Sequence, residues 1–395
     1  MLFANRAMPA VSEIAVTTST RRPQLPALTG IRAFVSLDIV FFHFSNPRWF
    51  GPLAPLVDSG FIGVSFFFVL SGFILSYNYC DRPEKMKARQ FWLTRFARLY
   101  PVYLLALVVS FRMLQAEWHA QTLAHFAEGM ALTPLMLQGW SPLLATFWNT
   151  PGWTLSCEVA FYAMLPLLVA VRWPRALGRL LALLGLLWMA GLVLPLLYLW
   201  LRPDGIAHVD RYSYSLWLRA LKFMPVPHVP EFLFGVVLAR LHAALGKATR
   251  ERLALTAVGL VATLGMMLAG SSLPFVLLHD GLLMPAFGIL ILGLAGEHVL
   301  AKPFGLAPVV LLGEASFCLY LLHFNLWELI HQYGLLTPLH LTQLDPWISY
   351  VLVISAALAA HRWVEVPGRT WILRQEWLKR LAEGKDTRLL APRIP

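Results

Sequence analysis

Long apolar stretches alternate with short polar connections along nearly the whole chain. A stretch of about 17 to 25 apolar residues is long enough to cross the hydrocarbon core of a bilayer as an α-helix. The pattern therefore predicts an all-α, polytopic membrane bundle of about ten transmembrane helices. The ten candidate stretches are 28–46, 61–79, 95–114, 153–171, 179–201, 229–246, 253–270, 275–296, 308–331 and 347–364.

A weaker apolar stretch at 122–138 is interrupted by His125, Glu128, Gly129 and Pro134. Ionisable and helix-disfavouring residues so close together argue against a further membrane-spanning helix. We interpret this stretch as an outer loop or a re-entrant segment. An eleventh crossing here would reverse the side of every later loop, so the distribution of charge tests the interpretation.

Lysine and arginine residues gather in alternate connections. With ten crossings and a cytoplasmic N-terminus, 26 of the 32 fall on the cytoplasmic side and 6 on the outer side. Cytoplasmic loops of membrane proteins carry such an excess, so we expect both termini in the cytoplasm. Topology then explains most of the formal net charge of +11, and no nucleic-acid partner is expected.

Composition agrees with a membrane protein. Hydrophobic residues make up 58% of the chain, charged residues only 13%, and the mean hydropathy is +0.63. Soluble proteins contain about 25% charged residues. The lipid bilayer is therefore the expected surrounding of most of the chain.

Three parts are expected along the sequence: a cytoplasmic N-terminal tail at 1–24, a transmembrane domain at 25–367 and a basic cytoplasmic tail at 368–395. The first part lacks the continuous apolar core of a cleaved signal peptide, so the first helix should both target and anchor the chain. In the last part, Trp371 and Trp377 stand among cations at helical spacing, which suits an interfacial helix.

Several small or soft residues are expected to pack rather than react. Cys80, Cys157 and Cys318 fall in or beside predicted spans and form neither a disulfide framework nor a metal site by their spacing. Gly63 and Gly72 permit close contact between helices. We expect no metal in this protein.

Arg32 and His43 stand on one face of the first predicted helix. Eleven residues at 100° each bring the second side chain back to nearly the same direction, about 16 Å further along the axis. Ionisable residues at membrane depth are costly and indicate a functional site. The alternative is an arginine that extends to the headgroups and a histidine bonded to a neighbouring helix.

Arg95 and Arg98 stand three residues apart at the cytoplasmic entrance of the third helix. Each guanidinium can donate two parallel hydrogen bonds, a geometry that suits phosphate oxygens. The alternative is ordinary anchoring of a cytoplasmic helix end by positive charge.

Glu158 and Tyr162 are four residues apart near the outer start of the fourth helix and can share a face. Helix geometry puts Glu158 at a depth similar to that of His43. A carboxylate and an imidazole at one level can pair, and the pairing would fix the tautomer of the histidine.

Ser316, Tyr320 and His323 recur at spacings of four and three in the ninth helix, so they form one polar face in the outer half of the membrane. The alternative for Ser316 and Tyr320 is hydrogen bonding between helices.

Taken in order, these motifs resemble the bacterial acyltransferase family three. The resemblance covers roughly residues 25–370. Its motifs are the Arg32 and His43 pair, Phe67-Phe-Val-Leu-Ser-Gly-Phe73, Arg95-Phe-Ala-Arg98, Trp153-Thr-Leu-Ser-Cys-Glu158, Phe232-Leu-Phe-Gly235, Ser316-Phe-Cys-Leu-Tyr-Leu-Leu-His323 and Val364-Glu-Val-Pro367.

The resemblance implies a membrane-bound O-acyltransferase of the bacterial cytoplasmic (inner) membrane. Such enzymes take an acyl group, commonly acetyl, from acyl-coenzyme A and place it on a sugar hydroxyl of a cell-surface polysaccharide, an O-antigen or a related glycoconjugate. The donor is a substrate, and no permanently bound cofactor is implied. The family's functional histidine corresponds to His43, and its arginines correspond to Arg32, Arg95 and Arg98.

Two departures from the family pattern stand out. Many members have an aspartate where this chain has Ser65, so a role for that acid does not transfer. Many members also continue into a soluble hydrolase-like domain, which is not expected here.

The positions imply a mechanism. Arg95 and Arg98 hold the coenzyme A phosphates, Arg32 supports the donor entrance, and the thioester extends between the helices toward His43. There His43 acts as general base on the acceptor hydroxyl, with Glu158 orienting the imidazole. An acyl-histidine intermediate is the alternative route.

A function from another class also fits ten spans with buried charges, namely a transporter of lipid-linked sugar or polysaccharide. Against it, the two halves of the chain show no matching pair of broken helices. A non-catalytic scaffold would leave the arginine pair without a cofactor to bind.

Overall fold

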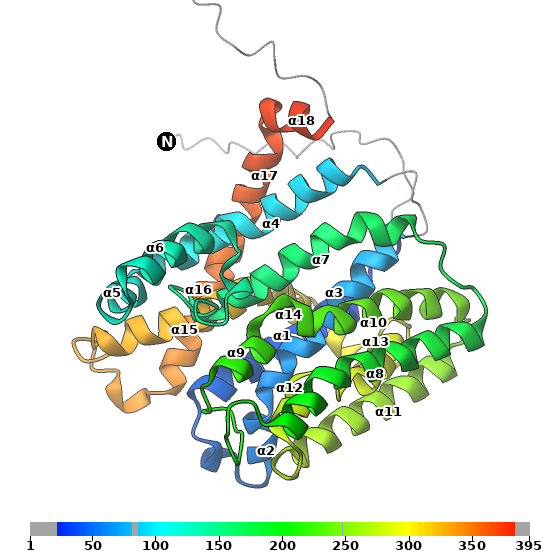
Figure 1. Ribbon diagram of the computed structural model, residues 1–395, viewed down its shortest axis with the longest axis horizontal. Helices are drawn as coiled ribbons and strands as arrows, with labels where there is room; N and C mark the ends of the chain where they lie inside the picture. The colour runs from blue at the N-terminus through cyan, green and yellow to red at the C-terminus, as the bar shows by residue number, and fades with distance from the viewer. Residues whose placement is uncertain (1–21, 81–85, 247, 384–395) are drawn as a thin grey trace, which may run out of the picture.

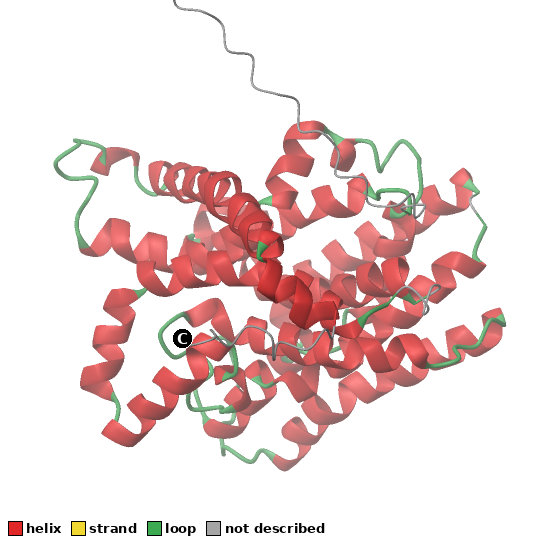
Figure 2. Cartoon of the chain, turned by 90° about the horizontal axis from the view of Figure 1, so that it is seen from above, coloured by secondary structure: helices red, strands yellow, loops and turns green. Residues whose placement is uncertain are grey.

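The computed structural model describes residues 22–80, 86–246 and 248–383, and within them every regular element is a helix (Figure 1). Most of the expected N-terminal tail at 1–24 and the end of the expected C-terminal tail, from residue 384, lie outside the described residues. The helices are joined mainly by short loops, as the view from above shows (Figure 2). This confirms the predicted all-α class.

Nine helical segments of the described residues are long and apolar enough to cross a membrane, or ten if one bent pair counts as a single span. Each coincides with a stretch predicted from the sequence. Their principal helices are α1 (Pro26–Phe44), α3 (Gly63–Tyr79), α4 (Ala88–Val109), α7 (Trp153–Ala170), α8 (Leu177–Leu201), α10 (Pro225–Ala244), α11 (Thr249–Leu268), α13 (Met284–Leu294) and α16 (Trp347–Ala360).

The ninth predicted span, 308–331, is broken. It consists of α14 (Ala307–Glu314) and α15 (Ser316–Gln332), whose axes differ in direction by 61°. Close packing accounts for the position of the break, because a Cβ atom on Gly313 would lie 2.0 Å from the Thr29 carbonyl oxygen of α1. The end of α14 is therefore fixed against α1, and α15 continues in a new direction.

The weak stretch at 122–138 does not form a span. It contains α6 (Leu123–Leu132), which follows α5 (Phe111–Ala120), and each helix has 10 residues. Ten helical residues extend only about 15 Å, half the thickness of the hydrocarbon core. The two helices form a hairpin beside α4 and α15, in keeping with the interpretation as a loop or re-entrant segment (Figure 1).

The centre of the bundle is the contact between α3 and α10. A Cβ atom on Gly72 would lie 2.0 Å from the Phe232 carbonyl oxygen, and one on Gly235 would lie 2.0 Å from that of Val69. Only glycine permits this approach of two backbones. On the other side of α3, a Cβ atom on Gly63 would lie 2.8 Å from Val35 of α1. The expected packing role of Gly63 and Gly72 is confirmed.

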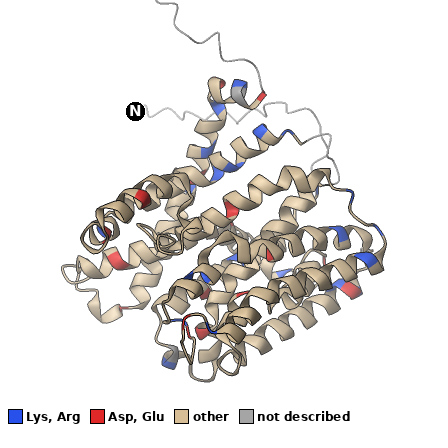
Figure 3. Cartoon of the chain, in the orientation of Figure 1, with Lys and Arg blue, Asp and Glu red and all other residues tan. Residues whose placement is uncertain are grey.

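The last helices leave the bundle at one end. A π-helical turn (His361–Glu365) joins α16 to α17 (Val366–Arg374), which packs on α4 and leads to α18 (Glu376–Glu383). We call this side of the molecule the α17 end; several Lys and Arg residues lie here on α4, α17 and α18 (Figure 3). Trp371 and Trp377 are exposed, as an interfacial helix requires.

The opposite side, which we call the α2 end, carries three short helices: α2 (Ala54–Asp58), α9 (Leu216–Phe223) and α12 (Phe275–His279). Arg32 of α1 lies near Arg98 of α4 and near Glu365, which directly precedes α17, whereas α1 also contacts α2. The helix therefore carries Arg32 and His43 toward opposite ends of the molecule.

Candidate active site

A cavity of about 210 Å³ lies among α1, α3, α4, α7 and α15. It brings together most of the polar side chains that the sequence indicated as functional. Those that line it are Arg32 of α1, Arg95 and Arg98 of α4, Glu158 and Tyr162 of α7, and Ser316 and Tyr320 of α15. We call it the arginine cavity. Apolar residues of α3, among them Phe67 and Leu70, complete its wall.

The three arginines carry unbalanced positive charge. No salt bridge within 4.0 Å is present for Arg32, Arg95 or Arg98 among the described residues. The Arg95 Nε atom is buried without a hydrogen-bond partner, and its guanidinium lies 5.6 Å from the centre of the Phe91 ring. Like charges held together in partial burial repel one another, so the cavity is suited to a ligand with several negative charges.

Glu158 belongs to the arginine cavity. It accepts a hydrogen bond from the Ser71 hydroxyl at 3.3 Å and contacts the Tyr162 hydroxyl, four residues further along α7. The charges nearest to it include those of Arg98 and Arg95. The shared face of Glu158 and Tyr162 is therefore present as the spacing indicated.

The expected pairing of Glu158 with His43 is not present among the contacts of the described residues. His43 is the last but one residue of α1, which ends at Phe44, whereas Glu158 lies more than a turn inside α7. The depth estimate treated both helices as upright, and a similar depth does not fix the distance between two helices across the bundle. The positions of the two helix ends separate the carboxylate from the imidazole.

His43 instead lies beside His323 of α15. The two ring centres are 5.2 Å apart, and Phe42 and Phe324 flank His43 at 4.9 and 5.8 Å. The His43 side chain keeps accessible surface, although protein groups surround it on most sides. It does not line the arginine cavity, but His323 connects the two, because its ring lies 5.9 Å from the ring of Tyr320 on the cavity wall.

His323 has a defined tautomer. Its Nδ1 atom lies 2.6 Å from the Tyr320 carbonyl oxygen, and a carbonyl oxygen can only accept, so Nδ1 carries the hydrogen. The Nε2 atom is then an acceptor when the ring is neutral. It is buried and has no hydrogen-bond partner. An unsatisfied buried acceptor next to His43 is available for a ligand or a hydroxyl group.

The other two residues of the polar face on α15 differ from each other. Tyr320 contacts the Thr154 hydroxyl of α7. This contact fits the second interpretation of Tyr320 from the sequence, a hydrogen bond between helices. The Ser316 hydroxyl is buried and has no partner, so it remains free to bond a ligand in the arginine cavity. Sequence reasoning missed Ser71 and Thr154, although both belong to motifs that it had singled out.

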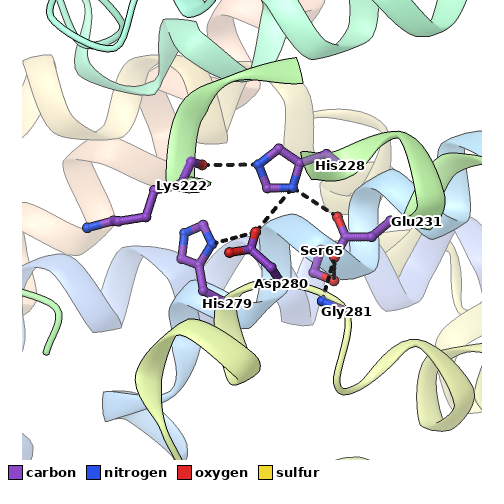
Figure 4. A network of polar contacts seen from close by, with 7 residues as sticks. All are labelled: Ser65, Lys222, His228, Glu231, His279, Asp280 and Gly281. Atoms are coloured by element: carbon purple, nitrogen blue, oxygen red, sulfur yellow. Dashed lines mark hydrogen bonds and ion pairs between the residues drawn. The ribbon is translucent and has the colours of Figure 1, made fainter. Parts of the chain in front are cut away.

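A second polar cluster lies next to the arginine cavity, beyond Phe68 (Figure 4). The buried His228 of α10 lies 3.1 Å from the carboxylate of Glu231 and 3.5 Å from that of Asp280. Ser65 donates a hydrogen bond to Glu231. The sequence has no aspartate at position 65, and the structure shows that an acid from α10 occupies the space beside Ser65.

Cys318, His361 and Glu365 offer ligand atoms that lie within 4.8 Å of one another, and such groups can bind zinc. Here the Cys318 thiol and the His361 Nδ1 atom both bond the same oxygen of Glu365, at 3.2 and 2.9 Å. These hydrogen bonds account for the cluster without an ion, since they fix the π-helical turn against α15. All three cysteines lie within the described residues, are buried and form no disulfide.

The fold and the arginine cavity define an integral membrane protein with a cavity rich in cationic side chains inside a helical bundle. Comparison with known families identifies the kind of protein further. The chain belongs to the acyltransferase domain family, whose model matches residues 25–360. It is therefore a membrane acyltransferase, as the motifs indicated.

Curated relatives agree with this assignment. The chain is 30% identical to the acyltransferase MdmB of Streptomyces mycarofaciens over 322 residues, which cover 76% of this chain and 78% of that protein. It is 26% identical to the peptidoglycan O-acetyltransferase OatA of Listeria monocytogenes over 392 residues, 89% of this chain but only 57% of the relative. The O-acetyltransferase OatA of Staphylococcus aureus matches a shorter part, 33% identical over 95 residues, 23% of this chain and 14% of the relative. No solved structure matches the chain.

Proposed function

We propose that this acyltransferase moves an acyl group, most simply acetyl, from acyl-coenzyme A to a hydroxyl group of a sugar in a cell-surface polysaccharide or related glycoconjugate. The observation that carries the proposal is the arginine cavity, in which three guanidinium groups outnumber the one carboxylate, Glu158, and form no salt bridge within 4.0 Å. The phosphates of coenzyme A supply several negative charges within reach of one another, as such a cavity requires.

Arg95 and Arg98 bind the phosphate oxygens, and Arg32 adds positive charge from α1. Glu158 acts as a positioning residue, because it and Tyr162 lie among the arginines rather than beside the imidazole pair. The pantetheine arm then extends toward the α2 end. Arg32 and His43 are about 16 Å apart along α1, a separation that the extended arm can span.

His43 acts as general base in the transfer. It accepts the proton of the acceptor hydroxyl while the hydroxyl oxygen attacks the thioester carbonyl carbon. The bond from carbon to sulfur breaks, and the thiolate takes up the proton, so no net proton is consumed. His323 lies next to His43 and presents its Nε2 atom from a fixed ring. An acyl group on His43 is the covalent alternative.

The protein resides in the bacterial cytoplasmic membrane with the α17 end in the cytoplasm, where acyl-coenzyme A is made. The excess of Lys and Arg near α17 and α18 supports this orientation (Figure 3). The acceptor then approaches from the α2 end. The donor and the acceptor therefore reach His43 from opposite sides of the membrane.

Mass spectrometry of cell-surface glycans tests the proposal. Cells that carry the wild-type gene are compared with cells that lack it and with cells that carry His43→Ala or, as a control, His331→Ala at an exposed position of α15. We expect one acetyl group on a glycan of the wild-type and His331→Ala cells, and its absence from the other two. Identical glycans in all four strains would contradict the proposed function.

A further inference from the structure

A further cavity lies at the α2 end, apart from the arginine cavity. Its volume is about 890 Å³, and it shares no lining residue with the arginine cavity. Residues of α2, of α12 and of the connection between α8 and α9 surround it. We call it the outer cavity. Ligand sites for small molecules typically enclose about 300 to 1,000 Å³, so its size suits a ligand of one or a few sugar rings.

One arginine on the wall of the outer cavity, Arg211, is paired with an aspartate, Asp58. An Arg211 Nη1 atom donates to Asp58 at 3.1 Å, and its Nη2 atom donates to the Tyr212 hydroxyl at 2.5 Å. Apart from His208, the ionisable groups are two arginines, Arg202 and Arg211, and two aspartates, Asp58 and Asp210. Their charges balance, in contrast to the arginine cavity. The outer cavity is therefore suited to a neutral polar ligand.

Aromatic rings stand next to these charges. The Tyr212 side chain is 73% exposed, and the Arg211 guanidinium lies 4.7 Å from its ring centre. Phe61 and Phe275 line the same cavity, with their ring centres 4.8 Å apart. Flat apolar ring faces beside carboxylate and guanidinium groups fit a sugar, which has apolar C–H faces and a rim of hydroxyl groups.

Hydrogen bonds hold the connection that forms one wall of the outer cavity in a defined conformation. Asp204 accepts hydrogen bonds from the Ser215 hydroxyl at 2.5 Å and from the Leu218 amide at 2.9 Å, and so caps α9. Asp210 accepts from the Ser213 hydroxyl and the Tyr212 amide, at 2.8 and 3.0 Å. These bonds fix the connection that carries Arg211 and Tyr212.

The outer cavity also adjoins the proposed base. Arg211 lies 4.8 Å from the centre of the Phe42 ring, and Phe42 lies 4.9 Å from the ring of His43. Phe61, on the cavity wall, lies 5.6 Å from Phe42. One side chain, Phe42, therefore lies between the imidazole of His43 and the outer cavity, and one, His323, lies between it and Tyr320 of the arginine cavity.

We infer that the outer cavity binds the acceptor as a neutral, hydroxyl-rich sugar, with Tyr212 against a ring face and the Asp58 and Arg211 pair bonded to adjacent hydroxyl groups. The inference rests on the proposed function and adds to it the acceptor's binding site and the absence of net charge on the sugar. Binding here places a hydroxyl group of the sugar near His43, while the donor stays in the arginine cavity.

Steady-state transfer tests the site. The probe is a preparation of de-O-acetylated oligosaccharides from the surface glycans of the source cells, and acetyl-coenzyme A is kept saturating. We expect Tyr212→Ala and Asp58→Asn to raise the half-saturating oligosaccharide concentration about tenfold, the size expected for one lost aromatic or charged contact. The dissociation constant of acetyl-coenzyme A should not change. The matched control is Tyr214→Ala, an exposed tyrosine of the same connection that does not line the cavity.

Direct binding separates this inference from the proposed function. Oligosaccharide binding to the His43→Ala protein is measured by calorimetry, with and without Tyr212→Ala, so the result does not depend on transfer. Loss of binding with Tyr212→Ala but not with Tyr214→Ala supports the outer cavity as the acceptor site, even if the wild type transfers nothing and the proposed function fails. Binding that is absent, or that is the same in both tyrosine variants, overturns it.

Discussion

At the scale of single residues, a charged side chain inside an apolar helical bundle costs free energy, and its presence therefore indicates a functional position. Arg32, Arg95, Arg98 and Glu158 interrupt apolar helices, and the sequence indicated them for that reason. All four line one cavity. Whether His43 and Glu158 are in contact could not be predicted from the sequence. The distance between side chains on two helices depends on the tilt of the helices and on where each helix ends.

The arginine cavity predicts the effect of removing one guanidinium. Arg98→Ala should weaken acetyl-coenzyme A binding about 10- to 100-fold, since a hydrogen bond to a charged group contributes about 1.5 to 3 kcal/mol. Arg98→Lys keeps the charge but loses the planar fork, so it should recover only part of the affinity.

Calorimetry on the purified protein measures these dissociation constants. Arg374→Ala, at an exposed arginine of α17, is the matched control and should bind like the wild type. If Arg98→Ala also binds like the wild type, the arginine cavity does not hold the phosphates.

At the scale of elements, the lengths of the apolar stretches were sufficient to predict where the spans lie. They were not sufficient to predict the 61° break between α14 and α15, because the break depends on the approach of Gly313 to α1. Gly72 illustrates the opposite case. Its packing role followed from the sequence, but its partner Gly235 became evident only from the structure.

The close contact between α3 and α10 predicts that a glycine-to-alanine substitution destabilises the protein there but not at an open position of another helix. Gly235→Ala places a methyl group 2.0 Å from the Val69 carbonyl oxygen, so the backbones must separate, at a cost of about 1 to 3 kcal/mol. Gly185→Ala, in α8, meets nothing within 4 Å and should be neutral or stabilise by up to about 1 kcal/mol.

Thermal unfolding in detergent measures both proteins. A lower melting temperature for Gly235→Ala alone is expected. Equal melting temperatures for the two variants would mean that α3 and α10 do not approach as closely as described.

The connection between α8 and α9 predicts a dependence on pH. Partial burial acts to raise the pKa of Asp204, but hydrogen bonds from Ser215 and from the amides of Trp217 and Leu218 outweigh it and hold the pKa below its usual value of 3.8. A carboxyl group whose pKa is lower in the folded state stabilises the fold at pH values above its unfolded-state pKa. This stabilisation is lost as the pH falls through the folded-state pKa.

Hydrogen exchange of the Trp217 and Leu218 amides measures the loss of their hydrogen bonds to Asp204. Protection should be constant above about pH 4 and fall below it. In Asp204→Asn, protection should be lower at neutral pH and should vary less across this range. Protection that is unchanged by acid in the wild type would contradict the capping role.

At the scale of the whole molecule, charge and hydropathy predicted the bundle and its expected orientation, since both follow from the bilayer itself. The two cavities could not be predicted in this way. The outer cavity is formed by side chains from distant parts of the sequence, such as Asp58 and Arg211, which no local pattern joins.

Cysteine labelling tests the orientation, because the native cysteines are buried. A membrane-impermeant maleimide should label Tyr212→Cys in intact cells. It should label Trp371→Cys only after the membrane is permeabilised, since the proposed orientation puts α17 in the cytoplasm. The reverse pattern would contradict the proposed approach of donor and acceptor from opposite sides.

The central claim is that His43 carries out acyl transfer from a donor held by the arginine cavity. Transfer of radiolabelled acetyl from acetyl-coenzyme A to extracted glycan, by purified protein in liposomes, tests it most directly. We predict that His43→Ala lowers the rate by at least about 100-fold, as expected for loss of a general base, and leaves acetyl-coenzyme A binding unchanged. Transfer by His43→Ala at the wild-type rate would contradict the account.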